Sequence, residues 1–355
     1  MSAAGIARKN WPAIFHSGNC AVTAVASRNF ERSRQFIAAG QAQTPFETPP
    51  IPLGSYEELL ASKNVDAVYI PLPTGLRKEW VLRAAAAGKH VICEKPCGVS
   101  FADVREMTDA CKKNRVQFMD GVMFMHSPRL ARVREILADG RSVGPVRRIS
   151  SAFSFYDGGD FFRDNIRVDG RLEPAGCLGD LGWYCLRFTL WAMNWQLPQT
   201  VTGHILSQST AGSGRVPSPT ELSGELFFGG GVSAGFYCSF LAPLQQWVSV
   251  SGQNGWLRLP DFVHPFDSYE PAFELNQSEV RVTEAGGEKV PSGADRTASA
   301  HPTAQDTRMF RNFANQVFSG KLNDDWPMWV LKTQQVMDAC FESALESGKP
   351  VKCKV

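Results

Sequence analysis

The sequence predicts two domains: a doubly wound α/β domain over residues 1–122 and an α/β domain with a large open, mostly antiparallel sheet over residues 123–355. The chain is more than twice the ~150 residues of a typical single domain. Its first third alternates short apolar strands with helices, which is typical of a parallel sheet covered on both faces. Later β-branched and aromatic runs are separated by glycine turns, which indicates hairpins. The predicted fold class is thus α/β followed by α+β.

The first domain is expected to alternate helices and strands. Its helices are expected at residues 8–17, 30–39, 56–62, 76–87 and 101–114, and its strands at 21–26, 66–70, 89–93 and 116–119. Ser55 and Glu58 form a capping box before the third helix, and Gly88 closes the fourth. Because the strands lack alternating polar residues, we expect both of their faces to be buried.

The second domain is expected to carry the open sheet and few helices. Its strands are expected at 147–155, 201–207, 222–228, 232–240, 247–250 and 256–259, its helices at 128–137 and 326–347, and polar loops at 209–219 and 286–305. The glycines at 229–231 and the Asn254-Gly255 pair mark hairpin turns. The last helix could return to pack on the first domain. Because the open face of the sheet needs a cover, we expect a homodimer or a higher homo-oligomer.

Composition narrows the class of protein. The chain has 37 Lys and Arg against 35 Asp and Glu, and a formal net charge of +2 favours neither a nucleic-acid partner nor an anionic membrane. The sequence contains neither the ~20 consecutive apolar residues of a membrane helix nor an apolar secretory segment near its start. Nine cysteines, an odd number spread over the chain, favour free thiols in a reducing compartment. We therefore expect a cytoplasmic protein.

The chain starts with a weak version of a glycine-rich phosphate-binding turn. Ser2 and Ala4 stand where the fingerprint G-x-G-x-x-G/A has its leading glycines. Ala4, Gly5 and Ile6 are candidate contacts for a dinucleotide, although an ordinary Ala-rich helix start is the alternative. The strand that should precede this turn is missing, and its loss would leave unpaired backbone groups on both neighbouring strands. We therefore expect the true product to start upstream of Met1.

The end of the strand at 21–26 favours NADP over NAD. An NAD site usually carries an acid at this position, which accepts a hydrogen bond from the ribose hydroxyl. This chain has Ser27 and Arg28 there, with Arg32 one turn later. A hydroxyl and guanidinium groups suit a 2′-phosphate. The alternative is that these arginines are solvated in a loop.

Two further segments carry candidate catalytic groups. Glu94 and Lys95 follow the strand at 89–93, at the edge of the sheet where α/β proteins bind ligands. On its own, such a turn is more often a plain salt-bridged turn. Asp180 and Tyr184 are four residues apart, so they share one face near the start of a helix. The alternative for this pair is a capping Asp and a core Tyr.

Four motifs occur along the chain in the order of a known family. They are Tyr-Ile-Pro-Leu-Pro-Thr at 69–74, Gly-Lys-His-Val-Ile-Cys-Glu-Lys-Pro at 88–96, Met-Asp-Gly-Val-Met-Phe-Met-His-Ser-Pro-Arg at 119–129 and Gly-Asp-Leu-Gly-Trp-Tyr-Cys at 179–185. Together they resemble the glucose–fructose oxidoreductase (Gfo/Idh/MocA) family. The closest branch is that of the dimeric dihydrodiol dehydrogenases and the NADP-dependent D-xylose 1-dehydrogenases. The resemblance covers nearly the whole chain and implies a Rossmann domain followed by a domain whose open sheet often pairs in oligomers.

The resemblance also implies roles for single residues. Lys95 matches the family's catalytic Lys, Tyr184 matches the acid/base of this branch, and Asp180 matches the acid of the same motif. Glu94 belongs to the expected cofactor contacts, and Arg77 stands where close relatives often have His. The turn expected beside the cofactor consists of Pro71, Leu72, Pro73 and Thr74.

The implied reaction transfers a hydride between NADP and a hydroxyl of a sugar or cyclic diol, with a lactone as the product from a pyranose. We expect Tyr184 to act as a phenolate, with the Lys95 ammonium lowering its ordinary pKa of ~10. Candidate substrate contacts are His126, Asn165, Arg167 and Trp183, and Phe155, Trp183 and Phe240 could form an apolar wall. His126 and Arg167 could instead be structural hydrogen-bond donors. The spacing of the histidines and cysteines does not suit a metal.

Two other functions stay open. One is a non-catalytic dinucleotide-binding sensor or regulatory protein, which the weak glycine motif favours and the presence of Lys95 and Tyr184 disfavours. The other is an enzyme like glucose–fructose oxidoreductase, which holds its cofactor tightly and exchanges two sugars. The chain shows neither a signal peptide nor an N-terminal arm that could wrap the cofactor, which disfavours this alternative.

Overall fold

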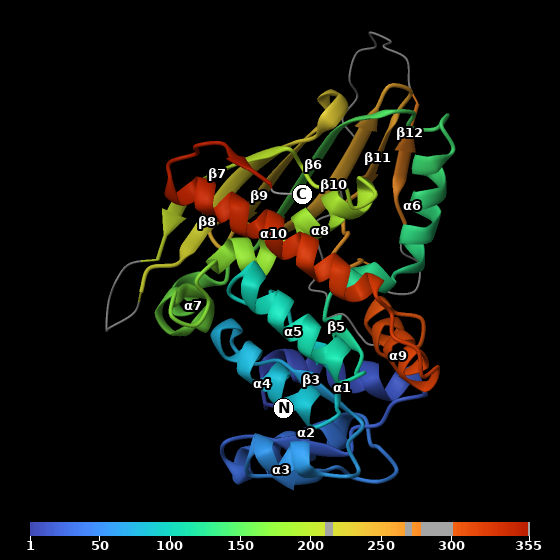
Figure 1. Ribbon diagram of the computed structural model, residues 1–355, viewed down its shortest axis with the longest axis vertical. Coiled ribbons are helices and arrows are strands. Elements are labelled where there is room, and N and C mark those ends of the chain that lie inside the picture. The colour runs from blue at the N-terminus through green and yellow to red at the C-terminus, as the bar shows by residue number, and fades with distance from the viewer. Residues whose placement is uncertain (210–215, 267–271, 278–300, 354–355) are drawn as a thin grey trace.

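The computed structural model describes residues 1–209, 216–266, 272–277 and 301–353. These residues form an N-terminal Rossmann domain and a C-terminal domain with an open sheet, as the sequence predicts (Figure 1). In Figure 1 the first domain lies at the bottom in blue and cyan, the sheet lies at the top, and the long red helix α10 runs between them.

The first domain follows the predicted alternation of helices and strands. Its elements are α1 Gly5–Ser17, β1 Ala24–Ala26, α2 Phe30–Gln43, β2 Ile51–Leu53, α3 Tyr56–Ala61, β3 Ala67–Ile70, α4 Thr74–Ala86, β4 His90–Cys93, α5 Phe101–Lys113 and β5 Phe118–Asp120. The side chains of Asn29, Ser55 and Ser100 each accept a hydrogen bond from the third residue of the helix that follows. The sequence did not predict β2, whose three residues include Pro52.

The parallel strands of this domain form two separate sheets. β1 pairs with β2, and β3 pairs with β4, which pairs with β5. No strand in the described chain joins β1 to β3, which agrees with the missing first strand. Between them, an apolar groove of about 130 Å³ is lined by Val25 and Val68, among others. The amino group of Met1 lies in it and donates a hydrogen bond to the carbonyl of Tyr69 at 2.9 Å. The expected upstream start stays a prediction.

The second domain contains an eight-stranded sheet with helices packed on it. Its elements are η1 Met123–His126, α6 Pro128–Ala138, β6 Val146–Ser154, α7 Gly158–Asp164, η2 Ile166–Val168, η3 Leu178–Gly182, α8 Trp183–Ala192, β7 Thr200–Gln208, β8 Pro219–Phe227, η4 Gly229–Gly231, β9 Ser233–Ser239, β10 Gln245–Gly252, β11 Trp256–Leu259, β12 Glu274–Asn276, α9 Gln305–Phe318, α10 Asp325–Leu345 and β13 Val351–Lys352. The strand order is β12-β11-β10-β6-β9-β8-β7-β13. Among the described strands of this sheet, only β6 and β9 pair in parallel, so the sheet is mostly antiparallel, as expected.

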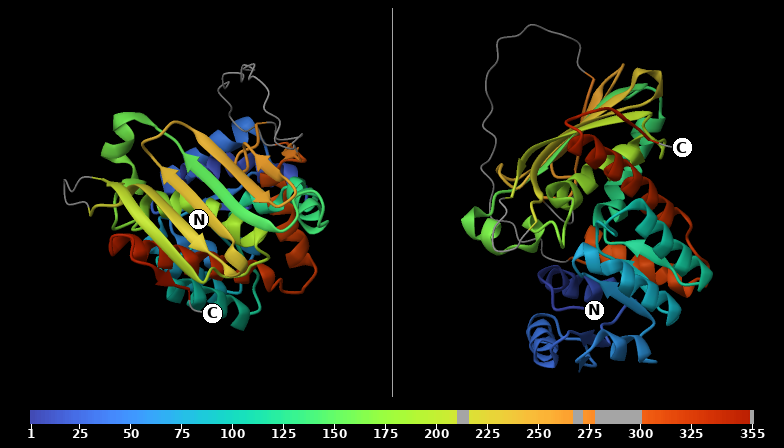
Figure 2. Two further views of the ribbon diagram at one scale, coloured as in Figure 1. Left: turned by 90° about the horizontal axis from the view of Figure 1, so that it is seen from above. Right: turned by 60° about the vertical axis from the view of Figure 1, so that its left-hand side comes forward.

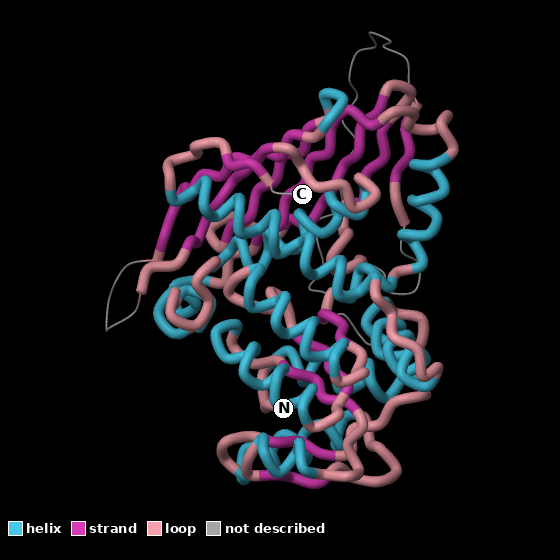
Figure 3. Tube along the Cα trace, in the orientation of Figure 1, coloured by secondary structure: helices cyan, strands magenta, loops and turns pink. Residues whose placement is uncertain are grey.

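The sheet has one covered and one open face. α8 contacts β6 and β9, and α10 contacts β7. Figure 2, left, shows the strands in front of the helices, so the near face carries no helix of the described chain. The tube in Figure 3 shows the same layering of helices beneath strands. α10 also contacts α5 and β5, so the last helix returns to the first domain.

A buried ion pair joins the two domains. Arg187 of α8 is fully buried, and its Nη2 lies 2.6 Å from Oδ2 of Asp120 at the end of β5. Its Nε donates to the hydroxyl of Thr333 in α10 at 2.7 Å. Because a buried charge is costly without a partner, these contacts fix α8, β5 and α10 relative to one another.

Other features of the chain were only partly predicted. α7, α9, β12 and β13 were not predicted from the sequence. Much of the loops expected at 209–219 and 286–305 lies outside the described residues. All nine cysteines are free thiols, and eight of them are buried. None of the helices in the described chain has the length and apolar character needed to cross a bilayer.

Candidate active site

A cleft of about 540 Å³ lies between the two domains. The first domain contributes the first turn of α1 and the turns that follow β3, β4 and β5, which share one edge of the sheets. The second domain contributes η2, η3, the start of α8, the loop 260–266 and the start of α9. The predicted site residues that line it are Ala4, Gly5, Ile6, Pro71, Leu72, Arg77, Glu94, Lys95, Arg167, Asp180 and Tyr184, together with Phe155 of the expected apolar wall.

Lys95, Asp180 and Arg167 form one charged cluster in this cleft. The Lys95 ammonium lies 2.5 Å from Oδ1 of Asp180 and 2.6 Å from its carbonyl oxygen. The Arg167 Nε lies 2.8 Å from Oδ2 of the same carboxylate. One carboxylate therefore holds two cations that come from different domains.

The two cations keep Asp180 ionised. Burial opposes ionisation, but the charges of Arg167 and Lys95 outweigh it and lower the pKa of the Asp180 carboxyl to about 2. Asp180 enters the cleft from η3, a π-helical turn directly before α8. That turn places its side chain between Lys95 and Arg167.

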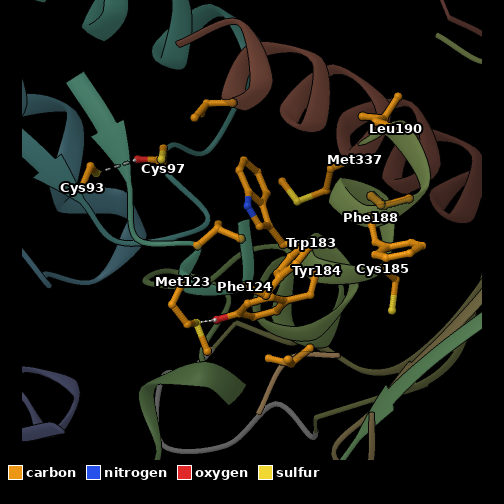
Figure 4. Close-up of a cluster of buried hydrophobic side chains, with 14 of the residues drawn as sticks. Cys93, Cys97, Met123, Phe124, Trp183, Tyr184, Cys185, Phe188, Leu190 and Met337 are labelled. Carbon is orange, nitrogen blue, oxygen red and sulfur yellow. Dashed lines mark hydrogen bonds between the residues drawn. The ribbon is translucent and has the colours of Figure 1, made fainter. Parts of the chain in front are cut away.

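Tyr184 lies beside this cluster at the start of α8. Its side chain is buried, its hydroxyl donates to the sulfur of Met123 at 3.8 Å (Figure 4), and its ring contacts Phe153 edge-on at 5.5 Å. Met123, Phe153 and Tyr184 all line the cleft. The Lys95 ammonium lies 4.8 Å from the centre of the Tyr184 ring. Lysine and phenol are therefore neighbours, as the expected chemistry requires.

The structure contradicts the expectation that Tyr184 is a phenolate with a lowered pKa. Burial raises the pKa of Tyr184 well above its ordinary value, and the carboxylates of Glu94 and Asp180 raise it further. Lys95 does not offset this effect, because its ammonium bonds to Asp180 and stands over the phenol ring. Tyr184 is thus a protonated phenol that can donate a proton.

A hydrogen-bonded chain connects the two halves of the first domain beneath the cleft. The Asn10 amide donates to the hydroxyl of Tyr69 at 2.8 Å, and this hydroxyl donates to Oε1 of Glu94 at 2.5 Å. Gly121 leaves room for the carboxylate, because a Cβ there would lie only 2.8 Å from Glu94 Oε1. Glu94 is therefore fixed from α1, β3 and the turn after β5.

Arg77 and Thr74 connect the turns around the cleft. Arg77 is buried, and its Nε donates to the carbonyl of Leu72 at 2.6 Å, while Nη1 donates to the carbonyl of Pro96. Thr74 donates from its backbone N–H and its hydroxyl to the carboxylate of Glu173 in the second domain, at 3.0 and 2.5 Å. Both residues thus hold backbone turns in place, although Arg77 also lines the cleft.

The first turn of α1 fits the phosphates of a dinucleotide. It contains no acidic residue, and a Cβ at Gly5 would meet no atom within 4 Å, so this turn is open. Helix N-termini attract anions through their free N–H groups and the helix dipole. Arg28 and Arg32 lie outside the cleft lining, exposed beyond the end of β1, and Ser27 is buried next to them. These residues fit NAD(P).

Several predicted contacts lie away from the cleft. His126 lies in a separate shallow pocket and hydrogen-bonds the amide of Asn312 at 3.1 Å. The Asn165 side chain accepts from the Arg167 N–H and caps η2. Trp183 is fully buried with its ring near the Arg187 guanidinium, and it does not line the cleft. Other predicted residues outside the lining are Pro73, Thr74 and Phe240.

The cleft is also lined by residues that were not predicted from the sequence, including Lys9, Phe153, Glu173, His264 and Asp306. Lys9 of α1 and Asp306 of α9 form an ion pair of 3.3 Å. None of these residues belongs to a recognised motif, and α9 was not predicted at all. No group of three or more His, Cys, Asp or Glu side chains in the described ranges could hold a metal ion.

Comparison with known proteins agrees with this geometry. Residues 3–122 match the oxidoreductase family with an NAD-binding Rossmann fold, and residues 130–258 match the GFO/IDH/MocA C-terminal domain. The D-xylose 1-dehydrogenase (NADP(+)) 2 of Haloferax volcanii is 30% identical over 357 residues, covering 99% of this chain and 98% of that protein. The chain belongs to the Gfo/Idh/MocA family. It is an NAD(P)-dependent oxidoreductase that acts on CH–OH groups.

Other known proteins are also similar to this chain. The bovine trans-1,2-dihydrobenzene-1,2-diol dehydrogenase is 32% identical over 240 residues, which cover 68% of this chain and 66% of that protein. A 3-ketoreductase from Actinomadura kijaniata, solved with NADP and TDP-benzene, has a TM-score of 0.77 at 24% identity and covers 96% of this chain and 95% of its own. A protein of gentamicin A biosynthesis, solved with NAD, has a TM-score of 0.78 at 17% identity and covers 100% and 95%. The two solved structures share the fold.

Proposed function

We propose that this protein is an NADP-dependent oxidoreductase that transfers a hydride between the nicotinamide and a hydroxyl of a sugar or cyclic diol, in the manner of a D-xylose 1-dehydrogenase or a dihydrodiol dehydrogenase. One observation carries the proposal: the side chains of Lys95, Asp180 and Tyr184 line the same cleft as the start of α1. The names of the two similar dehydrogenases support this substrate class.

The phenol of Tyr184 is the proton donor in the proposed reaction. When bound, the dinucleotide supplies or accepts the hydride. In the reducing direction, the Tyr184 hydroxyl donates its proton to the substrate carbonyl oxygen, and in the oxidising direction the phenolate removes the proton of the hydroxyl. Asp180 holds the Lys95 ammonium in place, and this ammonium stabilises the negative charge that develops on the oxygen atoms beside it.

Two exposed guanidinium groups support NADP as the cofactor. Arg28 and Arg32 lie beyond the end of β1, and no described residue hydrogen-bonds either side chain. An NAD site usually carries an acid directly after this strand, whereas Ser27 and Arg28 stand there in this chain. Guanidinium groups form bidentate bonds with phosphate, so this end of β1 suits a 2′-phosphate better than a free hydroxyl.

We also propose a homodimer, or a higher homo-oligomer, that covers the open face of the sheet, and a cytoplasmic location. Leu206 of β7 is 53% exposed and Phe227 of β8 is 44% exposed. Exposed apolar side chains on an open sheet favour packing against a second copy of the chain. Light scattering of the purified protein measures the mass, and a monomer at working concentration would contradict the oligomer.

The deciding experiment is a panel of pentoses, hexoses and cyclic diols with NADP⁺ and NAD⁺, followed by the absorbance of the reduced nicotinamide. We expect turnover with NADP⁺ and a loss of ~10²–10⁴-fold in kcat for Tyr184→Phe, with NADP binding unchanged. Tyr237→Phe is the matched control, because it removes a hydroxyl that bonds to Glu221 on the sheet, outside the cleft. Equal activity of Tyr184→Phe and wild type would contradict the proposal.

The same panel separates the two other functions. A sensor would bind NADP and turn over no member of the panel. An enzyme that retains its cofactor would be purified with stoichiometric nucleotide and would need a second sugar to complete each cycle. The proposed enzyme releases reduced nucleotide in every cycle.

A further inference from the structure

The loop 260–266 carries an imidazole into the cleft. His264 lies after β11 and lines the same cavity as Lys95 and Tyr184. Its ring meets that of Phe153 edge-on at 6.2 Å, and Phe153 in turn meets the Tyr184 ring at 5.5 Å. His264 is therefore separated from the reacting phenol by the width of one aromatic ring.

The backbone of His264 is held by buried side chains. The Gln246 amide is 3% exposed, and its Oε1 accepts from the His264 N–H at 2.6 Å while its Nε2 donates to the His264 carbonyl at 2.7 Å. The Gln305 amide donates to the carbonyl of Val263 at 2.7 Å. Two neighbouring peptide groups are thus fixed by side chains from β10 and α9.

The rest of the loop is fixed as firmly. Arg129 and Asp261 form a buried ion pair of 2.5 Å, and Oδ2 of Asp261 accepts from the Phe266 N–H at 2.6 Å. Phe262 and Val263 are buried in the core. A group held in this way is pre-organised, so it loses little entropy when it binds a ligand.

The two ring nitrogens of His264 are available for hydrogen bonds to a ligand. Neither ring nitrogen of His264 has a hydrogen-bond partner in the described part of the chain. Burial, with the charges of Lys9 and Lys95, lowers the pKa of His264 to about 3, although Asp180 opposes this. A neutral imidazole has one donor and one acceptor nitrogen. This pair of functions matches a hydroxyl group, which also donates and accepts.

We propose that His264 binds a second hydroxyl group of the substrate, distinct from the one at the reacting carbon, and that the enzyme is therefore selective for polyhydroxylated substrates over simple alcohols. This inference rests on the proposed function. His264 fixes the substrate across the Phe153 ring from Tyr184, so it determines specificity and orientation without taking part in proton transfer.

The test compares wild type with His264→Ala, His264→Asn and the control His204→Ala, whose side chain is exposed on β7 outside the cleft. Each is assayed with NADP⁺ and the best sugar or diol of the panel, for example D-xylose, and with derivatives that each lack one hydroxyl. We expect His264→Ala to lower kcat/KM for the full substrate by ~10–100-fold, mainly through KM. The asparagine variant should retain part of the activity, and His204→Ala all of it.

The derivatives show whether the loss comes from one hydroxyl. For the derivative that lacks the bound hydroxyl, wild type and His264→Ala should have the same kcat/KM. An equal loss with every derivative would mean a structural role and overturn the inference, as would no loss with any. If wild type turns over no sugar or diol, the proposed function itself fails, which is a different result from an active enzyme that is insensitive at position 264.

Discussion

The Lys95 ammonium stands over the ring of Tyr184 at 4.8 Å from its centre, while its short hydrogen bonds go to Asp180. The cation therefore contacts the π face of the phenol and leaves the hydroxyl to Met123. A positive charge in this position binds the ring by a cation–π contact and does little to ionise the oxygen. Tyr184 thus keeps its proton at neutral pH, because its pKa is raised well above the ordinary value.

The raised pKa of Tyr184 predicts a different pH dependence for each direction of the reaction. The phenol is the acid for carbonyl reduction, so kcat for reduction should stay flat between about pH 6 and about pH 9. The phenolate is the base for oxidation and is scarce below its pKa, so this rate should rise by up to ~10-fold per pH unit over the same range. Initial rates at constant ionic strength measure both. An oxidation rate that is already constant near neutral pH would contradict the prediction.

Replacing Lys95 should lower the catalytic rate constant kcat. Lys95→Met removes one of the two cations on Asp180 and the charge beside Tyr184, so kcat should fall by ~10²–10³-fold. Lys78→Met is the control, because Lys78 pairs with Asp103 and Glu106 on the surface of the first domain. Steady-state kinetics with NADP⁺ and the best substrate give the answer. Comparable kcat values for Lys95→Met and Lys78→Met would refute a catalytic Lys95.

The guanidinium groups after β1 should determine the choice of cofactor. Replacing both Arg28 and Arg32 with Ala removes the charges that suit a 2′-phosphate, so kcat/KM for NADP⁺ should fall by ~10²-fold or more, while that for NAD⁺ should change little. The ratio of the two values is the measurement. Arg34→Ala removes a nearby exposed guanidinium that pairs with Glu31, and it should leave the ratio unchanged.

The buried ion pair between the domains should contribute more to the free energy of unfolding than an exposed ion pair does. Asp120→Asn leaves the fully buried guanidinium of Arg187 without its counter-charge, and the free energy of unfolding should fall by ~3–5 kcal/mol. Glu57→Gln breaks an exposed pair with Arg83, and this should cost at most ~1 kcal/mol. Urea unfolding followed by tryptophan fluorescence measures both. Similar losses for the two variants would show that Asp120 contributes no more than a surface carboxylate.

Local patterns in the sequence predicted most of the fold. Apolar runs and caps such as Ser55 indicate every helix of the first domain, and every strand of it except β2, to within a few residues, because these elements are determined by neighbouring residues. They fail for β2 and β12, which have three residues each, and for α9. These elements depend on contacts with distant parts of the chain.

The candidate site was predicted only where a motif carries it. Lys95, Asp180 and Tyr184 belong to motifs, and the structure brings them together. His264 has no motif around it, and its position depends on Gln246 and Gln305, which are 18 and 41 residues away in the sequence. The raised pKa of Tyr184 was missed for a similar reason, since the burial that causes it is a property of the folded chain.

The reactivity of the buried cysteines can report which part of the protein unfolds first. Cys93 and Cys111 lie inside the first domain, Cys238 and Cys340 inside the second, and only Cys20 is partly accessible among the nine. A bulky disulfide reagent should therefore modify the native protein at no more than one position. Labelling at increasing denaturant concentration, with the modified cysteines identified by mass spectrometry, would show in which domain the buried thiols become reactive first. This experiment needs no engineered probe.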